Sequence, residues 1–236
     1  MLKKFIKLTT AISTIILTFN LTTINVFSDE SNSKTIYLTF DDGPAKKITE
    51  ETLDILKKED VPATFFIIGD QIKGQEKLLM RMKDEGHSVG LHSMSHDRCK
   101  LYSGNNNFLK EMLEERDSIK EVIGIDCNIL RFPFGCNNRT FHLTPDLVDI
   151  IHKNNLKIYD WNVDTTDGAN VGASPYKYVK NAKSNKETVF LLMHCGYINK
   201  TSPKALPEII KYYKDKGYKF KAITDETDEI FHYISK

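Results

Sequence analysis

Two adjacent aspartates, Asp41 and Asp42, stand at the end of a short apolar run and are followed by a Gly-Pro turn. Two carboxylates at the end of a buried strand are costly unless a cation or another partner compensates their charge. Neighbouring side chains on a strand point in opposite directions, so the turn must bring both carboxylates to one site with different surroundings. One could then ligate a metal ion while the other takes a proton. A surface turn with an Asx hydrogen bond is the alternative for this pair alone.

Two histidines four positions apart, His92 and His96, could place both imidazoles on one face of a helical turn. Such pairs also occur by chance, and a structural or merely exposed pair is the alternative interpretation. Combined with a strand-end carboxylate, the histidines would form a metal site with coordination positions open for water and substrate. The divalent ion expected there is Zn²⁺, although the ligand types alone admit other divalent ions.

Further polar residues follow other apolar runs of the chain. Arg131 closes one run, Asp164 and Asp167 follow another, and His194 follows a third. Together with the aspartates and the two histidines, they form five polar clusters just past expected strand ends. In a βα barrel those ends share one rim, where such folds place their active sites.

Strands and helices are expected to alternate along the chain. β-rich runs predict strands over residues 36–40, 63–68, 88–91, 129–132, 158–163, 188–193 and 219–223. Amphipathic spacing predicts helices over residues 48–58, 75–84, 108–122, 144–152, 176–182 and 203–216, with a short closing helix from Asp228. Thr144 is expected to cap its helix, with Pro145 in the first turn.

Seven βα units in alternation predict a parallel sheet with helices outside it. The shared rim of polar clusters favours a single-domain α/β fold, a distorted (β/α)7 TIM-like barrel, over a doubly wound sheet. The length of 236 residues suits one such domain. The charges are nearly balanced, with 33 Lys+Arg against 32 Asp+Glu, and give no basis for a nucleic-acid partner. A monomer is expected.

The amino terminus has the layout of a secretory signal peptide over residues 1–28, ahead of a catalytic domain over residues 34–236. Three lysines precede a largely uncharged run that is rich in Thr, Ser and Asn. An uncleaved anchor is the alternative, and it would be the chain's only contact with a membrane. In both cases the domain is expected outside the cytoplasm, secreted or attached to the cell envelope.

Five motifs, in this order, resemble those of the polysaccharide deacetylases, the NodB-homology or family-4 carbohydrate esterases. The resemblance covers the chain from about Lys34 to its carboxyl terminus, and five ordered motifs are a specific signal. The motifs are Thr39-Phe40-Asp41-Asp42-Gly43-Pro44, His92-Ser93-Met94-Ser95-His96, Arg131-Phe132-Pro133-Phe134-Gly135, Asp164-Thr165-Thr166-Asp167 and Leu192-Met193-His194.

The resemblance implies a division of work among the motif residues. Asp42, His92 and His96 would hold the metal ion, which would polarise the acetyl carbonyl and lower the pKa of a water. Asp41 would be the general base that takes a proton from the attacking water. His194 would be the general acid that protonates the departing amine.

Other motif residues would support these groups. By the resemblance, Arg131 would orient the base through a charge-assisted pair, and Asp167 would hydrogen-bond the catalytic histidine and keep it protonated. Leu192, Pro133 and Phe134 would contact the substrate, with Leu192 lining a small apolar pocket for the acetyl methyl group. A backbone N–H near Phe134, or the metal itself, could stabilise the oxyanion.

The chain departs from the family pattern at the fourth motif. The family usually has Trp after the motif aspartate, whereas Gly168 follows Asp167 here, and the indole that forms part of the acetyl pocket wall is missing. The single tryptophan, Trp161, could be a core residue rather than a replacement. Histidines outside the motifs, including His232, are expected at the surface or at helix caps.

Four cysteines could form two disulfides, but a domain of this size does not need them. They are therefore expected to be free or optionally paired. Two of them should lie near the rim, where a disulfide or an influence on the metal is a hypothesis. The cysteines are Cys99, Cys127, Cys136 and Cys195, of which Cys136 and Cys195 follow motifs.

Export and a lone catalytic domain favour peptidoglycan as the substrate, through its N-acetylglucosamine or N-acetylmuramic acid. Chitin-like oligosaccharides, poly-N-acetylglucosamine and acetylated xylan are alternatives with the same mechanism. A glycan-binding protein without activity and a metal phosphoesterase are alternatives of other classes. The intact Asp41, Asp42 and three motif histidines oppose the first, and the lack of a basic cradle for phosphate opposes the second.

Overall fold

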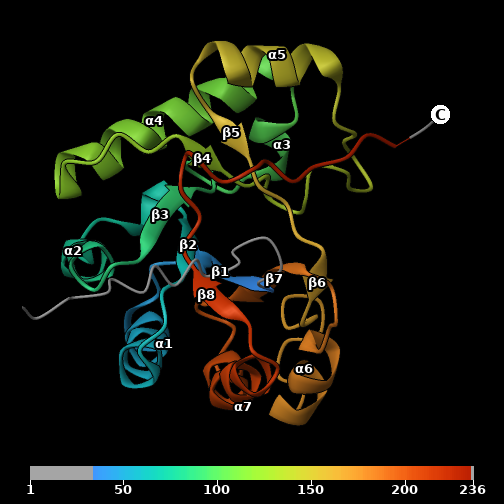
Figure 1. The fold of residues 1–236 in the computed structure, drawn as a ribbon. Coiled ribbons are helices and arrows are strands. Elements are labelled where there is room, and N and C mark those ends of the chain that lie inside the picture. Colours follow the sequence, from blue (N-terminus) through green and yellow to red (C-terminus); the bar gives the residue numbers. More distant parts are fainter. Residues whose placement is uncertain (1–33, 235–236) are drawn as a thin grey trace, which may run out of the picture. The chain divides into compact units, whose positions relative to one another are not determined.

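A computed structural model describes residues 34–234, which form a parallel sheet with helices packed outside it (Figure 1). The strands run in the order β5-β4-β3-β2-β1-β7-β6, and β8 pairs with β1. Their bounds are β1 (Thr35–Gly43), β2 (Thr64–Ile67), β3 (Ser88–Leu91), β4 (Ile129–Leu130), β5 (Lys157–Ile158), β6 (Val163–Asp164), β7 (Thr188–His194) and β8 (Lys219–Lys221).

Strand β1 pairs with three other strands of the sheet. It pairs with β7 from Thr35 to Asp41, while its other edge is shared by β8 along the first residues and by β2 from Thr39 onwards. Leu38, Thr39 and Phe40, which alternate between the two faces of β1, are all buried, as expected for a parallel strand covered on both faces. The carboxyl end of β1 therefore lies between two neighbouring strand ends.

The helices lie outside the sheet and follow the strand order (Figure 1). Neighbouring helices pack against one another in the order α6-α7-α1-α2-α4-α5, and a short α3 packs on α4. Their bounds are α1 (Lys46–Glu59), α2 (Glu76–Asp84), α3 (Arg98–Leu101), α4 (Asn105–Ile123), α5 (Pro145–Lys153), α6 (Pro175–Ala182) and α7 (Ser202–Asp215), with a 3-10 turn, η2 (Gly69–Gln71). Between residues 34 and 234, no helix is long and apolar enough to cross a membrane. The leader expected over residues 1–28 lies outside the described part of the chain.

The predicted barrel-like α/β fold is confirmed, but the sheet is open, with β5 and β6 as its end strands. The single strand predicted over residues 158–163 is wrong, because the segment divides into β5 and β6. The carbonyls of Tyr159 and Asp160 accept hydrogen bonds from Arg131 Nε at 2.8 Å and Nη2 at 2.9 Å. Since the arginine takes the acceptors that a neighbouring strand would use, the ladder is interrupted there.

The closing helix predicted from Asp228 is also wrong. Residues 228–234 are not helical, and Ile230 forms a parallel bridge with Tyr159. The Ile230 carbonyl accepts from the Asp160 amide at 2.7 Å, and its amide donates to the Ile158 carbonyl at 3.2 Å. These backbone groups are satisfied at the edge of the sheet, so the segment extends the β5 end instead of coiling.

Helix α5 begins as predicted. Thr144 lies in an extended conformation before Pro145, and its hydroxyl accepts the Leu147 amide at 3.3 Å. This bond satisfies one of the amides that lack a partner inside the first turn.

Replacing the cap with alanine, Thr144→Ala, should lower the free energy of unfolding by about 1 kcal/mol, because the Leu147 amide loses its acceptor. Chemical denaturation measures this change. The matched control is Ser174→Ala at the start of α6, where the serine makes no side-chain cap bond, so its loss should be close to zero. Equal losses in the two variants would show that the cap hydrogen bond contributes nothing.

Candidate functional site

A pocket of about 210 Å³ lies at the carboxyl ends of the strands. It is surrounded by the ends of β1 and β7 and by the segments that follow β3, β4 and β6. Seven of the predicted site residues line it together, so four of the five motifs reach one cavity. The lining consists of Asp41, Asp42, His92, His96, Phe134, Gly135, Trp161, Gly168, Leu192, His194, Ile198 and Asn199.

The two aspartates reach the pocket through a local irregularity of β1. The strand continues through both residues, and its register with β2 shifts between Asp41 and Gly43. Asp42 has a left-handed backbone with φ 68°, which is uncommon for a residue with a side chain. Because of this turn both carboxylates face the cavity, as the sequence required, although a regular strand would point them apart.

Asp42 and the two histidines form a compact set of ligating atoms. Asp42 Oδ1 lies 3.5 Å from His92 Nε2 and 3.4 Å from His96 Nε2, and the three ligating atoms lie within 4.8 Å of one another. Asp42 Oδ1 is buried and has no hydrogen-bond partner. Two ligands bound about 2.1 Å from one tetrahedral ion are separated by roughly 3.4 Å. These spacings therefore fit a shared divalent cation.

The tautomer of His92 points to the same conclusion. His92 Nδ1 lies 2.9 Å from the Arg131 carbonyl, which can only accept, so a neutral ring carries its proton on Nδ1. Its Nε2 lone pair then faces the carboxylate oxygen of Asp42, which is repulsive without a cation between them. Burial and the neighbouring His92 lower the pKa of His96 to about 4, so the His96 ring is neutral near pH 7. Neutral imidazoles are the form that binds metal.

Asp41 is held by a buried arginine. Arg131 Nη1 donates to Asp41 Oδ1 at 2.9 Å and to Thr39 Oγ1 at 2.7 Å, and the arginine is completely buried. The other carboxylate oxygen, Asp41 Oδ2, lies 3.7 Å from His92 Nε2. Arg131 itself does not line the pocket but fixes the orientation of a carboxylate that does.

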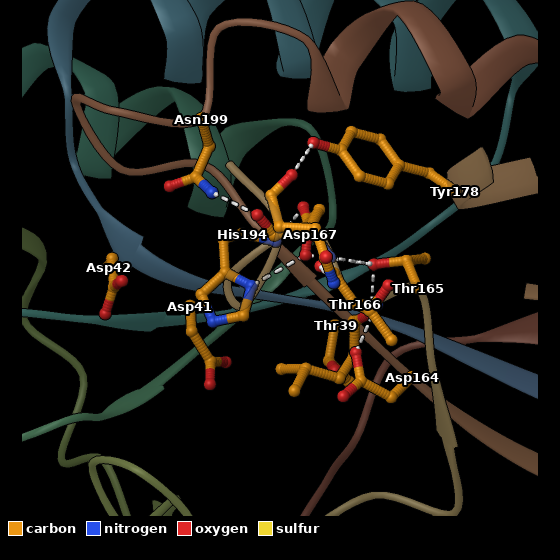
Figure 2. Close-up of polar contacts among 12 residues, drawn as sticks. Thr39, Asp41, Asp42, Asp164, Thr165, Thr166, Asp167, Tyr178, His194 and Asn199 are labelled. Atoms are coloured by element: carbon orange, nitrogen blue, oxygen red, sulfur yellow. Dashed lines mark hydrogen bonds and ion pairs between the residues drawn. The ribbon is translucent and has the colours of Figure 1, made fainter. Parts of the chain in front are cut away.

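On the opposite side of Asp41, the carboxylate of Asp167 holds His194. Asp167 is completely buried, and its Oδ1 lies 2.8 Å from His194 Nδ1 while its Oδ2 accepts the His194 amide at 2.9 Å. Figure 2 shows the imidazole between Asp167 and Asp41. Burial alone would lower the pKa of His194, but the hydrogen bond and charge of Asp167 outweigh it and raise the pKa to about 9. The ring is therefore protonated at neutral pH.

The three residues predicted to contact substrate differ in position. Leu192 lines the pocket and is nearly buried. Phe134 lines the rim, where its ring packs edge-on against His96 and beneath the Arg98 guanidinium. Pro133 is buried and absent from the lining, and its carbonyl accepts the Tyr102 hydroxyl at 2.5 Å.

Trp161 belongs to the pocket and is not only a core residue. Its half-buried indole lines the cavity and packs close to Gly135, where an added Cβ would lie 3.0 Å from the ring. Gly168 lies against His194, and a Cβ there would come within 2.5 Å of the imidazole Cε1. A side chain at position 168 is incompatible with this position of His194. The wall of the pocket is formed instead by Trp161 and Ile198.

A buried glutamate under the histidine motif was not found from the sequence. Glu115 on α4 is completely buried, and its Oε1 accepts the His92 amide at 3.1 Å. Burial raises the pKa of this carboxyl well above its usual range. In the sequence it is one of several glutamates on a long polar helix, so no local signal separates it from its solvated neighbours.

All four cysteines are free, so the disulfide alternative is not realised. Cys195 is buried, and a Cβ at Gly43 would lie 2.8 Å from its sulfur. Cys136 donates to Asp160 Oδ2 at 2.9 Å. Neither thiol is part of the Asp42, His92 and His96 cluster.

Comparison with known proteins gives consistent matches. Residues 28–148 match the family described as polysaccharide deacetylase. The chain is 38% identical to a peptidoglycan-N-acetylglucosamine deacetylase of Bacillus cereus, covering 82% of this chain and 71% of the relative. It is 30% identical to a peptidoglycan-N-acetylmuramic acid deacetylase of Bacillus subtilis, covering 83% and 72%. A crystal structure of a polysaccharide deacetylase from Bacillus cereus superposes with a TM-score of 0.73 at 36% identity, covering 83% and 94%.

The parallel half-barrel and its relatives define a hydrolase of the carbohydrate esterase class. Within that class, the chain belongs to the polysaccharide deacetylase family.

Adding one methyl group at the pocket wall, Gly168→Ala, should displace the His194 imidazole, because the new Cβ would overlap it. We expect kcat for deacetylation to fall by roughly ten- to a hundred-fold with the fold intact. The control is Gly172→Ala, outside the lining, where an added Cβ meets no atom within 4 Å; its left-handed backbone (φ 79°) makes the alanine variant less stable, but kcat should stay normal. Steady-state kinetics with circular dichroism measure both variants, and unchanged kcat in Gly168→Ala would contradict this account of the wall.

Proposed function

We propose that this chain is an extracytoplasmic, zinc-dependent deacetylase that removes acetyl groups from N-acetylated sugars of peptidoglycan and releases acetate. The expected leader supports export, and the names of two relatives support the polymer. One observation carries the reaction. Asp41 and His194 are register partners on β1 and β7 beside the Asp42, His92 and His96 cluster, so a base, an acid and a ligand set share one pocket.

Asp42, His92 and His96 would hold the divalent ion, and two imidazoles with one carboxylate suit Zn²⁺. When bound, the ion supplies positive charge that polarises the acetyl carbonyl. The remaining steps are carried out by side chains of the chain.

Asp41 would act as the general base. Arg131 engages Oδ1, which leaves Oδ2 available on the pocket side to take a proton from the attacking water. The water oxygen forms a bond to the acetyl carbon as this proton leaves. An arginine that fixes one carboxylate oxygen prevents the base from rotating away from its substrate.

His194 would act as the general acid. Asp167 holds Nδ1, so the Nε2–H of the protonated ring is free to donate to the amide nitrogen as the carbon–nitrogen bond breaks. The products are acetate and the sugar amine. Leu192 in the lining would contact the acetyl methyl group, and its nearly buried side chain keeps water from that part of the pocket.

Zinc-loaded full-length protein should remove acetyl groups from purified peptidoglycan fragments, detected by mass spectrometry of the glycan and by an assay for acetate. Chelation should abolish the activity and zinc should restore it.

Asp41→Asn should lower kcat by about 10²- to 10⁴-fold, because the base is lost. Asp149→Asn, an exposed aspartate on α5, is the matched control and should keep normal activity.

The same assay separates the substrates. Faster release from chitin oligosaccharides, poly-N-acetylglucosamine or acetylated xylan would overturn peptidoglycan as the polymer and leave the mechanism standing. Full activity in Asp41→Asn would overturn the proposed base.

The pH profile should report His194. Its pKa of about 9 lies above the ordinary value of 6.5, so the acid form persists through neutral pH and is lost as pH rises through about 9. Activity should therefore fall on the alkaline side near that pH. Asp167→Asn removes the partner that raises the pKa, so the alkaline limb should move towards 6.5. An alkaline limb at the same pH in both proteins would exclude His194 as the titrating acid.

A further inference from the structure

A second group of ligating side chains lies outside the acetyl pocket, on the open side of the sheet. Cys136 follows the β4 segment, Asp160 lies between β5 and β6, and His232 comes from the carboxyl-terminal segment. One ligating atom from each lies within 4.8 Å of the other two. Between residues 34 and 234, only this group and the Asp42 cluster meet that spacing.

The group contains a buried carboxylate with an unused oxygen. Asp160 is only 7% exposed and its Oδ2 accepts the Cys136 thiol at 2.9 Å, while Oδ1 is buried and has no hydrogen-bond partner. Such an oxygen is costly to bury unless a cation or a donor satisfies it. Cys136 is completely buried, whereas His232 is exposed and can approach with little rearrangement.

We propose that Cys136, Asp160 and His232 bind a second zinc ion, distinct from the ion of the acetyl pocket. Thiolate, imidazole and carboxylate are the donors that zinc accepts together, whereas Mg²⁺ and Ca²⁺ prefer oxygen ligands only. Binding displaces the thiol proton of Cys136 to solvent, and the sulfur then bonds the ion in place of the proton. Three protein ligands leave a fourth position for water on the side of the exposed His232.

The ion would fasten the carboxyl-terminal segment across the opening of the sheet. Residues next to His232 already contact this edge, since Ile230 bridges Tyr159 and the His232 carbonyl accepts Asn137 Nδ2 at 2.6 Å. The Asp160 carbonyl accepts Arg131 Nη2 at 2.9 Å, and Arg131 holds Asp41. The second ion would therefore stabilise the segment that holds Arg131, and through Arg131 the proposed base Asp41, without contacting the substrate pocket.

The test counts zinc ions bound to full-length protein after removal of all metal and re-addition of Zn²⁺, by elemental analysis. Wild-type protein should bind two ions, and Cys136→Ser and His232→Ala one each. His142→Ala removes an exposed imidazole near Cys136 that is outside the cluster, and it should keep two. Because His232 is exposed, its variant should fold even where the buried Cys136→Ser does not.

Cobalt separates this proposal from the proposed function. The acetyl-pocket ligands contain no sulfur, so a thiolate-to-cobalt charge-transfer band reports Cys136 alone. The band should persist in Asp42→Ala, which removes the first site, and disappear in Cys136→Ser. In the Asp42→Ala background, zinc at about a hundred times its Kd should raise Tm by roughly 5–10 °C, and added His232→Ala should abolish the shift.

One ion in the wild type with no thiolate-to-cobalt band, two ions in His232→Ala, or a band that survives Cys136→Ser would overturn the second site. Each of these results leaves the deacetylase assay unaffected, so the two proposals fail separately.

Discussion

The site depends on one buried ion pair, between Arg131 and Asp41. Arg131 is completely buried, and its guanidinium meets Asp41, Thr39 and the carbonyls of Tyr159 and Asp160. Removing one partner of such a pair leaves an uncompensated charge in the interior, at a cost of about 3–5 kcal/mol. The pair therefore fixes Asp41, and the same guanidinium occupies two carbonyls of the connection between β5 and β6, where the ladder is interrupted.

Two carboxylates next to each other in sequence have different partners in space. Asp41 is engaged by a cation of the chain, whereas Asp42 Oδ1 faces two imidazole nitrogens at 3.4 and 3.5 Å and lacks a hydrogen-bond donor. The left-handed turn at Asp42 makes this division possible. On the far side, Asp167 holds His194 in its protonated form, so the pocket contains a fixed carboxylate and a charged imidazole on neighbouring strands, β1 and β7.

The pocket wall shows how this chain accommodates its departure from the family pattern. Gly168 leaves room for His194, and the indole of Trp161 enters the lining from the segment between β5 and β6. That same segment carries Asp160, which contacts Arg131 through its carbonyl and Cys136 through its carboxylate. The irregular connection across the open side therefore contributes to the pocket wall, to the support of Asp41 and to the second group of ligating residues.

The sequence by itself determined the alternation of strands and helices, the Thr144 cap and the residues that meet at the rim, because hydrophobic periodicity and strand-end placement are local signals. Tertiary structure decided the rest. The break between β5 and β6 and the extended segment at Ile230 depend on hydrogen bonds to Arg131 and Asp160, residues that are distant or in a neighbouring segment. The burial of Glu115 and the place of Trp161 in the pocket likewise depend on partners from other elements. Such contacts produce no periodic pattern in the sequence, because the type of a side chain gives its chemistry whereas its neighbours depend on the fold.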